Sequence, residues 1–466
     1  MDESIKNITL TFQPKKVIAM TNPIADTNVI IIGELKKFMK DSVMIAENRV
    51  QYIQSASKDF TRRRVLTFEI LVLLILNALK RSLSIEIQNF FEQISLGVPC
   101  SKQAFCEQRA KLSHSFFHDW NQVLVKSFYQ HYGDRVKTWN GFRLLAVDGS
   151  TLPLPDSEAL REKFGGATNQ IANSLTPTVR VCVLYDVLNN IAIRGILRPY
   201  FVSEDDMTIP CIENQANENT LLLFDRGYPS YWLMYRLLQM KTNFVMRVSQ
   251  SANNAVKSFV NSEEDDIIID MYPPYSSRKR LKDMGIMIDK HTTIRVRLVK
   301  VLLNTGEVEV LISNLYDTAL YTIEEMKEVY HLRWGIETFY GYMKEELQLG
   351  QFSGIREICI QQDFAANLFL FNLQSLIEKQ TQPYVDAVSK KRVHDYKVNK
   401  NISWASLKNR VVKLFIEEDS LQILIELQKL FEWNLIPIRP GRKYSRMKKR
   451  NYNGKYHTLT NYKRAI

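Results

Sequence analysis

Short apolar runs alternate with helix-like segments between residues 141 and 248, and this alternation constrains the fold more than any other feature. The runs LLAV and LLLF are each followed by an aspartate, Asp148 and Asp225. The segments VRVCVLYDVLNN and IAIRGILRP meet at Asn189-Asn190 and predict a hairpin, while YWLMYRLLQM predicts a helix before the strand NFVMRVS. Strands interleaved with helices predict a mixed α/β or α+β fold, in which helices flank a sheet.

The pattern differs on both sides of this region. Residues up to about 140 read as helical, with a buried helix and a second helix between Val65 and Phe91. Strand patterns return between about 250 and 317, and we interpret them as a β-rich insertion. We therefore expect three regions: a helical N-terminal domain over 1–140, an α/β domain over 141–380, and a helical region with a basic tail over 381–466.

The segment GVPCSKQAFCEQRAKLSHSFF predicts a short helix that Ser101 caps. Lys102, Gln103, Arg109 and Lys111 give this helix polar and basic groups. Two interpretations fit the segment equally: a helix-turn-helix-like DNA-binding unit, or a plain corner of a helical bundle.

The bulk composition favours a polyanionic partner. The formal net charge of the 466 residues is +12 and the pI is about 9.2, which favours nucleic acid first and anionic membrane surfaces second. Five scattered cysteines form no C-x-x-C pair, which argues against a disulfide framework or a zinc knuckle and favours a reducing compartment. The N-terminus lacks a signal pattern, and the most apolar run, Ile70 to Leu76, is too short to span a bilayer. We expect a cytosolic protein that does not enter a membrane.

The two aspartates after apolar strands are candidate metal ligands. A carboxylate at the carboxyl end of a strand lies where α/β proteins form ligand sites. If the two strands are neighbours, their spacing of about 4.8 Å brings Asp148 and Asp225 close enough to share a hard cation. Aspartates at strand ends also occur simply as turn formers.

A third acid lies in the segment YHLRWGIETFYGYMK, for which we predict a single helix. At about 100° per residue, four polar side chains of this helix share one stripe. They are Tyr330, Arg333, Glu337 and Lys344. An ordinary solvated face has such a stripe too, but one carboxylate with two cations and a phenol suits a metal ion and phosphate oxygens. Three carboxylates without a sulfur or imidazole set suit two Mg²⁺ ions, or Mn²⁺ as a substitute, which promote in-line phosphodiester displacement.

These residues resemble the DDE transposases of bacterial insertion sequences, and specifically the insertion sequence 4 family. The family signature Y-x-x-R-x-x-x-E-x-x-x-x-x-x-K is matched at Tyr330, Arg333, Glu337 and Lys344. The first acid of the family lies in D-G-[ST] and the second in D-x-G-[YF], as Asp148-Gly149-Ser150 and Asp225-Arg226-Gly227-Tyr228 do here. The resemblance covers about residues 140 to 380.

The resemblance implies an RNase H-like core with a β-rich insertion before the helix that carries the glutamate. It implies Mg²⁺-dependent hydrolysis at transposon ends and transfer of the 3′-OH into target DNA, with Asp148, Asp225 and Glu337 as catalytic and metal-binding residues. It also implies a homodimer on double-stranded DNA in the bacterial cytoplasm, associated with the nucleoid. Two alternatives stay open: an RNase H-like nuclease without joining activity, and a catalytically inactive DNA-binding regulator.

Further contacts with DNA are expected outside the three acids. In relatives whose insertion holds a flipped base a tryptophan stacks on it, but residues 250–317 contain no tryptophan, and Tyr272 and Tyr275 are the candidates to replace it. The expected phosphate or DNA contacts are Tyr330, Arg333, Lys344, Arg226, Lys448, Lys449 and Arg450. The last three lie in a tail after Arg439 in which Tyr444, Tyr452, Tyr456 and Tyr462 are interleaved with cations and no acid occurs. Such a tail either contacts DNA or merely keeps the protein in solution.

Overall fold

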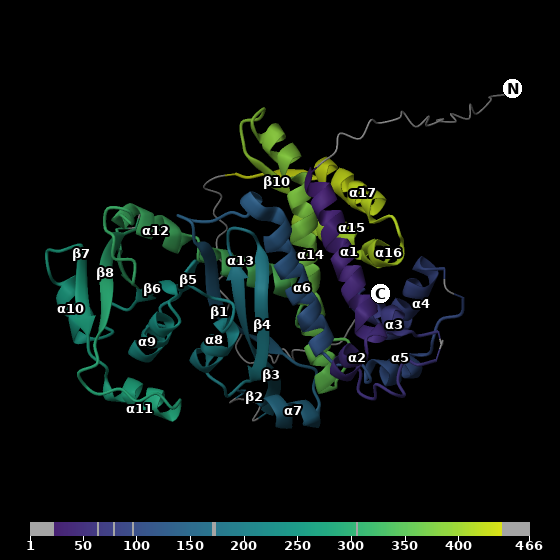
Figure 1. The fold of residues 1–466 in the computed structure, drawn as a ribbon, viewed down its shortest axis with the longest axis horizontal. Helices are drawn as coiled ribbons and strands as arrows, with labels where there is room; N and C mark the ends of the chain where they lie inside the picture. The colour runs from purple at the N-terminus through teal and green to yellow at the C-terminus, as the bar shows by residue number, and fades with distance from the viewer. Residues whose placement is uncertain are drawn as a thin grey trace.

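The computed structural model describes residues 23–439 apart from 63–64, 78–79, 96, 170–173 and 304–305. It confirms the predicted mixed α/β fold, with one large sheet and helices packed around it. In Figure 1 the strands β7 and β8 lie at one end of the molecule, and helices from both ends of the chain gather at the other. The basic tail with Lys448, Lys449 and Arg450 lies outside the described residues.

The N-terminal part is helical, as predicted. Its helices are α1 Pro23–Met44, α2 Ala46–Tyr52, α3 Phe68–Leu76, α4 Leu83–Gln93, α5 Lys102–Arg109 and α6 Ser115–Tyr132, followed by the short 3₁₀ helix Gly133–Arg135. The hydroxyls of Thr67 and Ser101 cap α3 and α5 by accepting bonds from backbone N–H groups in the first turn. Almost every side chain of α3 is buried, which agrees with its uninterrupted apolar sequence.

The main sheet combines parallel and antiparallel pairs. Its strands are β1 Arg143–Pro153, β2 Gly166–Asn169, β3 Ser174–Asp186, β4 Ile191–Pro199, β5 Thr220–Phe224, β6 Asn243–Val248, β7 Asp266–Met271, β8 Ile294–Leu302 and β9 Val308–Ser313. They lie in the order β2-β3-β1-β5-β6-β9-β8-β7, and β4 also pairs with β3. β1, β5 and β6 run parallel, and every other pair is antiparallel. The predicted hairpin is therefore confirmed as β3 and β4.

The strands between residues 250 and 317 extend this same sheet. β9 pairs with β6, with Val245 opposite Ser313, and β8 and β7 follow. The segment also holds two helices that the sequence did not predict, α10 Asn254–Val260 and α11 Tyr275–Asp283. α10 is short and α11 is largely charged and exposed, so neither shows a strong apolar period. The other helices of the sheet region are α7 Glu158–Phe164, α8 Glu204–Ile212 and α9 Tyr231–Gln239.

The long helix α14 joins the sheet to the helices from both chain ends. The C-terminal elements are α12 Ile323–His331, α13 Trp334–Glu345, α14 Glu357–Ser389, β10 Tyr396–Val398, α15 Lys400–Lys408, α16 Val411–Ile416, α17 Ser420–Trp433 and β11 Leu435–Pro437. α14 contacts β4, α6, α1 and α17, and it passes through the middle of the molecule in Figure 1. Trp120 of α6 stacks on Phe369 of α14 with ring centres 4.1 Å apart. α14 thus packs against both the sheet and the helices.

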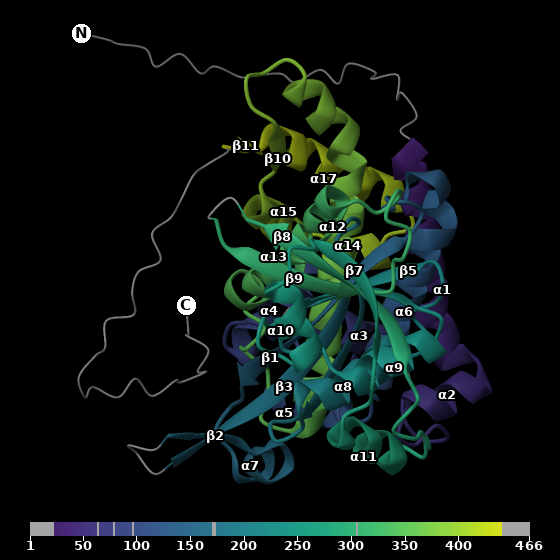
Figure 2. The ribbon, with the colours of Figure 1, turned by 90° about the vertical axis from the view of Figure 1, so that its left-hand side faces the viewer.

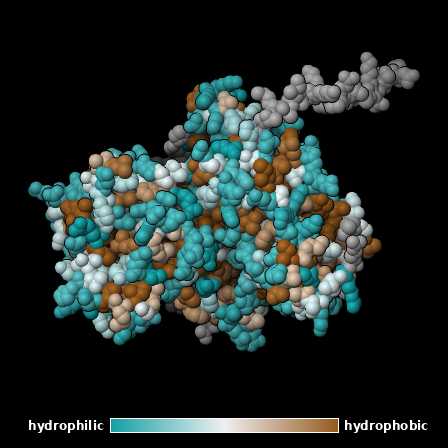
Figure 3. Space-filling model, viewed as in Figure 1, coloured by the Kyte–Doolittle hydropathy of each residue, from teal (hydrophilic) through white to brown (hydrophobic). Residues whose placement is uncertain are grey.

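The surface elements complete the fold. Figure 2 shows β10 and β11 together near the top of the molecule, where they form a separate two-stranded sheet. On the face drawn in Figure 3, hydrophilic residues predominate and hydrophobic ones are scattered among them. Among the described residues, we find no helix that combines the length and the apolar character needed to cross a bilayer.

Candidate active site

Two parallel strands bring the first two acids to one edge of the sheet. β1 pairs with β5, with Ala146 opposite Leu223, and two residues further along each strand stand Asp148 and Asp225. The condition on which a shared cation depends, that these two strands are neighbours, is therefore met. Asp225 directly follows Phe224, the last residue of β5. Two carboxylates therefore leave adjacent strands at the same level.

The prediction that Asp148 ends its strand is wrong. β1 continues to Pro153 because β3 pairs with it along this whole length, with Asp148 opposite Val183. Only the pairing with β5 stops before Asp148. Asp148 is therefore held by a hydrogen-bonded strand on one side and is free of sheet pairing on the other, whereas Asp225 lies in the turn after its strand.

Burial and neighbouring charges destabilise the ionised form of Asp148. Its Oδ1 accepts a hydrogen bond from the backbone N–H of Gly149 at 2.9 Å. Burial, together with the negative charges of Glu204 and Asp225, raises the pKa of Asp148 to about 7, although the hydrogen bond from Gly149 and the positive charge of Arg333 oppose this increase. The carboxyl group thus lacks sufficient positive charge nearby.

Glu204 is a fourth carboxylate that sequence reasoning missed. It is the first residue of α8, and its side chain packs on Gly149, where a Cβ atom would lie 2.6 Å from Glu204 Cδ. Arg180 of β3 donates to Glu204 Oε1 at 2.9 Å. The acidic first turn after the Ser203 cap was visible in the sequence, but only the sheet register places it beside Asp148.

The predicted single helix from Tyr330 to Lys344 is instead two helices, α12 and α13, joined by a tight turn. Within this turn the N–H groups of Leu332 and Arg333 bond to carbonyls three residues back, and so does that of Gly335. Gly335 packs closely on Val187, and glycine also weakens a continuous helix here. The helical wheel of the unbroken helix therefore misplaces Tyr330 relative to Glu337.

Arg333 lies in this turn between two aromatic rings. Its guanidinium carbon is 5.7 Å from the ring centre of Tyr330 and 5.4 Å from that of Trp334. Its NH2 group donates to Glu337 Oε1 at 2.8 Å. Its Nε is buried and has no hydrogen-bond partner among the described residues. One donor of this buried cation thus remains available for a further acceptor.

The other polar residues of this segment reach the same edge of the sheet. The Tyr330 hydroxyl donates to Asp225 Oδ1 at 3.4 Å, and burial raises the pKa of this phenol, so it stays protonated. Lys344 Nζ donates to Ser150 Oγ at 2.5 Å, and burial lowers the pKa of Lys344 while the charge of Asp148 opposes that decrease. Although the helix is broken, these side chains do converge on β1 and the end of β5.

Tyr340 fixes α13 against β1. Its buried hydroxyl donates to the backbone carbonyl of Asp148 at 2.9 Å. Tyr340 was not identified from the sequence, because a tyrosine on an apolar helix face is usually a core residue. This bond sets the distance between the helix that carries Glu337 and the strand that carries Asp148.

The oxygen ligands of this edge suit a hard divalent cation. Within the part of the chain that the structure describes, no three His, Cys, Asp or Glu side chains are gathered closely enough to hold a metal ion. The carboxylate of Glu337 is engaged by Arg333, and that of Asp225 accepts the Tyr330 hydroxyl. Burial is the main cause of the raised pKa of Asp148, and the charges of Glu204 and Asp225 add to it, so a cation beside these acids would stabilise the ionised carboxylate. The donor set therefore fits Mg²⁺ or Mn²⁺ in its chemistry.

Arg226 lies beside the acids, at the rim of a cavity. This cavity has a volume of about 760 Å³ and is also lined by Arg247 and Lys257. Arg247 is paired with Glu309 at 3.0 Å, whereas Arg226 is exposed and makes no ion pair with any described residue. Tyr272 and Tyr275, the candidates for base stacking, are both exposed near α11.

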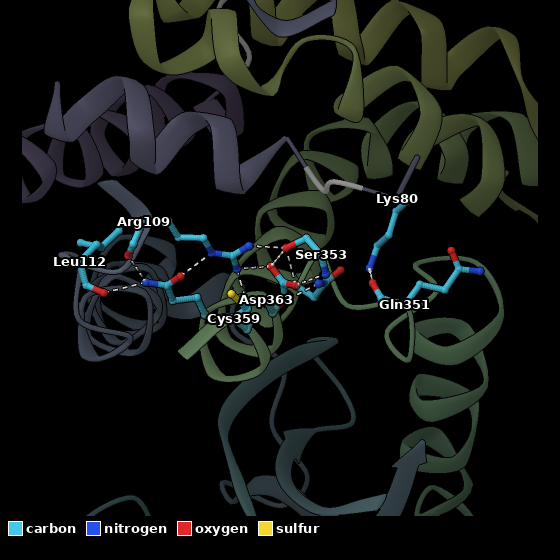
Figure 4. A network of polar contacts seen from close by, with 9 residues as sticks. Lys80, Arg109, Leu112, Gln351, Ser353, Cys359 and Asp363 are labelled. Carbon is cyan, nitrogen blue, oxygen red and sulfur yellow. Dashed lines mark hydrogen bonds and ion pairs between the residues drawn. The ribbon is translucent and has the colours of Figure 1, made fainter. Parts of the chain in front are cut away.

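Arg109, which we placed on a possible DNA-binding helix, is buried instead. As Figure 4 shows, its guanidinium donates to Gln362, Ser353, the Cys359 carbonyl and Asp363. A buried arginine whose three guanidinium nitrogens all donate to groups inside the protein cannot contact a phosphate. This geometry favours the bundle-corner interpretation of α5 over a helix-turn-helix unit that reads DNA through Arg109.

Comparison with known proteins identifies relatives over the same region. The family described as Transposase DDE domain matches residues 139–373, which include Asp148, Asp225 and Glu337. Transposase InsG for insertion sequence element IS4, from Escherichia coli strain K12, is 23% identical over 239 residues, which cover 50% of this chain and 52% of that protein. The match thus spans about half the length of this curated relative. A cryo-EM structure of a piggyBac transposase synaptic complex with hairpin DNA aligns with a TM-score of 0.40 and 13% identity, over 96% of this chain and 93% of that chain.

Proposed function

Because the chain belongs to the Transposase DDE domain family, we propose that it is a DNA transposase. In this proposal it hydrolyses phosphodiester bonds at the ends of its element and transfers the freed 3′-OH into target DNA. One observation carries the proposal beyond the family match. Asp148 and Asp225 leave adjacent parallel strands at the same level, and α13 is bonded to this edge through Tyr340 and Lys344.

The order of the strands supports an RNase H-like core. β4, β3 and β1 form an antiparallel group, and β5 and β6 then run parallel to β1. The region after β6 adds β9, β8 and β7 to the edge of that core before α12 and α13 begin. This agrees with a β-rich insertion at about 250–317 that precedes the helix with Glu337.

We assign Asp148, Asp225 and Glu337 as the catalytic carboxylates that would hold Mg²⁺, with two ions and with Mn²⁺ as a substitute. When bound, such ions activate the attacking oxygen and stabilise the leaving oxygen of a phosphodiester displacement. The oxygen-only donor set and the uncompensated charge around Asp148 support this assignment.

The neighbouring side chains would bind and orient the DNA backbone. Arg333 has a buried Nε–H with no acceptor among the described residues, so a phosphate oxygen would satisfy it. Lys344 brings a second cation beside Ser150, and Arg226 a third, beside Asp225. Tyr330 would orient the Asp225 carboxylate through its hydroxyl.

We extend the proposal to partners and organisation. The substrate is double-stranded DNA at the inverted-repeat ends and at the target, bound by a homodimer in the bacterial cytoplasm in association with the nucleoid. In this proposal residues 1–140, 141–380 and 381–466 are regions of different function. They are not units with separate cores, because helices from the first and last regions share one hydrophobic core with α14.

The test is cleavage and joining of a labelled duplex that carries the flanking inverted repeat, with Mg²⁺ present. The wild type should give joined product, and Asp148→Ala should give neither cleaved nor joined DNA. Asp283→Ala removes an exposed carboxylate on α11 that makes no ion pair with a described residue, and it should react as the wild type does. Cleavage without joining would overturn the transposase proposal in favour of a nuclease. Binding without cleavage would overturn it in favour of a DNA-binding regulator.

A further inference from the structure

A second basic cavity lies away from the three acids, between the end of α6, the helix α14 and the strand β10. Its volume is about 630 Å³, and two of the elements that line it, β10 and α14, lie side by side near the top of Figure 1. Its lining includes five cations and two carboxylates: Arg135, Lys137, Lys379, Lys397 and Lys400, with Glu378 and Asp386. Positive charge therefore exceeds negative charge in this cavity.

The carboxylates of the cavity form an ion pair with only one of its four lysines, Lys400. Glu378 Oε2 pairs with Lys400 at 2.6 Å, and Asp386 Oδ1 accepts from the side-chain amide of Gln382 at 2.7 Å. Lys137, Lys379 and Lys397 form no ion pair with any described residue. These three lysines come from three separate segments: the loop after the 3₁₀ helix, α14 and β10.

Lys379 is more buried than the other two lysines. Its ammonium lies 5.4 Å from the ring centre of Phe128, and burial lowers its pKa to about 8. The carboxylate whose charge acts on it most, Asp186, is already saturated: it accepts from the Tyr129 hydroxyl at 2.6 Å and from the Asn189 backbone N–H and side-chain amide at 2.9 Å each. The buried hydroxyl of Ser375 also lines the cavity and has no partner among the described residues. An anion with several oxygens would satisfy both groups.

The chain also continues from this cavity into its most basic stretch. Ile438 lines the cavity, and its N–H bonds to the carbonyl of Asp395. The residues that follow Arg439, 440–466, contain many lysines and arginines and no acid. The positive charge of the cavity is therefore continued by the sequence directly after it.

We propose that this cavity binds the phosphate backbone of double-stranded DNA outside the catalytic site. The proposal rests on the proposed transposase function and adds a second contact surface to it. Three uncompensated lysines on three segments match a repeating polyanion better than a single small anion, because each can neutralise a different phosphate. Lys137 is held in place for this role by Asn189, which donates to its carbonyl and accepts from its N–H, each at 2.9 Å.

The test compares two triple variants by fluorescence anisotropy on a labelled duplex of about 40 base pairs, between about 50 and 200 mM NaCl. The site variant carries Lys137→Gln, Lys379→Met and Lys397→Gln, with methionine chosen to preserve packing on Phe128. The control variant carries Lys290→Gln, Lys413→Gln and Lys429→Gln, three exposed lysines outside the cavity and in no ion pair with a described residue. Each lost phosphate contact should reduce the slope of log K against log salt by about 0.9, so the site variant should lose roughly 2 to 3.

The outcomes separate this proposal from the proposed function. An unchanged slope in the site variant, or an equal loss in the control variant, overturns the proposal. The double variant Lys137→Gln with Lys397→Gln changes only exposed residues, so it tests the site even if the triple variant fails to fold; its slope should fall by roughly 1 to 2. If the wild type cleaves and joins DNA while all variants bind alike, only the cavity proposal fails. If the wild type neither binds nor cleaves, the proposed function itself fails.

Discussion

Two arginine–carboxylate pairs of similar length differ in how far the protein encloses them. Arg109 and Asp363 are 2.7 Å apart, with side chains exposed by only 2% and 9%. Arg333 and Glu337 are 2.8 Å apart, with 4% and 39% exposed. In both pairs the guanidinium is buried. The difference lies in the carboxylate, which is enclosed in the first pair and partly open to solvent in the second.

The hydrogen bonds sharpen this contrast. Each nitrogen of the Arg109 guanidinium has an acceptor, and Asp363 also accepts from the N–H and the hydroxyl of Ser353. Arg333 has an unused buried Nε instead. A closed pair holds two distant segments together, whereas an incomplete pair retains binding capacity for a ligand. The comparison teaches that a buried arginine in an ion pair can still keep a donor without an acceptor, and such a donor is available to a ligand.

The largest expected effect comes from neutralising Glu337, the carboxylate of the more exposed pair. Glu337→Gln should reduce Mg²⁺-dependent cleavage by roughly 100-fold to 1000-fold or more, because it removes a charge from the reacting centre. Its free energy of unfolding should change by less than about 1 kcal/mol, since Glu337 is partly exposed. Gel assays of cleavage and urea unfolding measure the two quantities. Glu345→Gln, on the exposed face of the same helix, is the matched control and should retain activity.

Removing the arginine should destabilise the protein much more in the enclosed pair than in the partly open pair. Arg109→Met leaves the Asp363 carboxylate buried without its cation and should cost about 3 to 5 kcal/mol of unfolding free energy. Arg333→Met leaves Glu337 accessible to water, so its cost should be at least about 2 kcal/mol smaller, while DNA binding and cleavage both weaken. Urea unfolding of both variants decides the matter. Equal destabilisation would mean that Arg333 is as structural as Arg109.

Sequence reasoning found what is local and missed what depends on distant partners. The hairpin of β3 and β4, the cap at Ser101 and the apolar helix α3 follow from neighbouring residues, and each was predicted. The adjacency of Asp148 and Asp225 followed from the general geometry of parallel strands. Arg109 was misread because its partners Gln362 and Asp363 lie more than two hundred residues away in the sequence.

The detailed site geometry was beyond the sequence for the same reason. Glu204 reaches Asp148 only because β3 and α8 fold over Gly149. The break between α12 and α13 reflects the close packing of Gly335 on Val187, a contact across about 150 residues. A wheel drawn from the sequence alone assumes an unbroken helix and cannot include such contacts.

A smaller effect, on the pH dependence of stability, tests whether the charge of Asp148 is uncompensated in the folded protein. The pKa of Asp148 rises from 3.8 to about 7 on folding, so the folded state binds the proton more tightly than the unfolded state, and stability falls as pH increases through this range. Asp148→Asn should therefore stabilise the metal-free protein above pH 7 by an amount on the order of 1 to 4 kcal/mol. The gain should disappear as pH falls toward 3.8.

Thermal melts in EDTA at several pH values measure this effect. Asp363→Asn is the contrasting variant, because the charge of Arg109 and the bonds from Ser353 outweigh burial and lower the pKa of Asp363. That variant should lose stability at neutral pH, and its deficit should shrink in acid. A loss of stability in Asp148→Asn at pH 8 would contradict the view that burial and the neighbouring acids destabilise the ionised form of Asp148.

The smallest expected effect concerns Lys344 and its hydroxyl partner. Ser150→Ala removes the acceptor of the Lys344 ammonium and should cost about 0.5 to 1.5 kcal/mol of stability, with a severalfold loss of cleavage. Ser150→Thr keeps a hydroxyl and should restore both. If Ser150→Ala reacts as fast as the wild type, Lys344 is positioned without this bond.

The closed network around Arg109 limits how parts of this protein can be exchanged with those of its relatives. Lys80 donates to the carbonyls of Gln348 and Gln351, and Arg109 binds Ser353, so N-terminal helices hold the loop that follows α13. The family match begins at residue 139 and ends at residue 373, inside α14. A chimera built on those boundaries would contain Asp363 without Arg109, the cation that pairs with it, and would interrupt the long helix α14. The region that matches the family, residues 139–373, is therefore shorter than the part of the chain that has to be transferred together to keep these contacts.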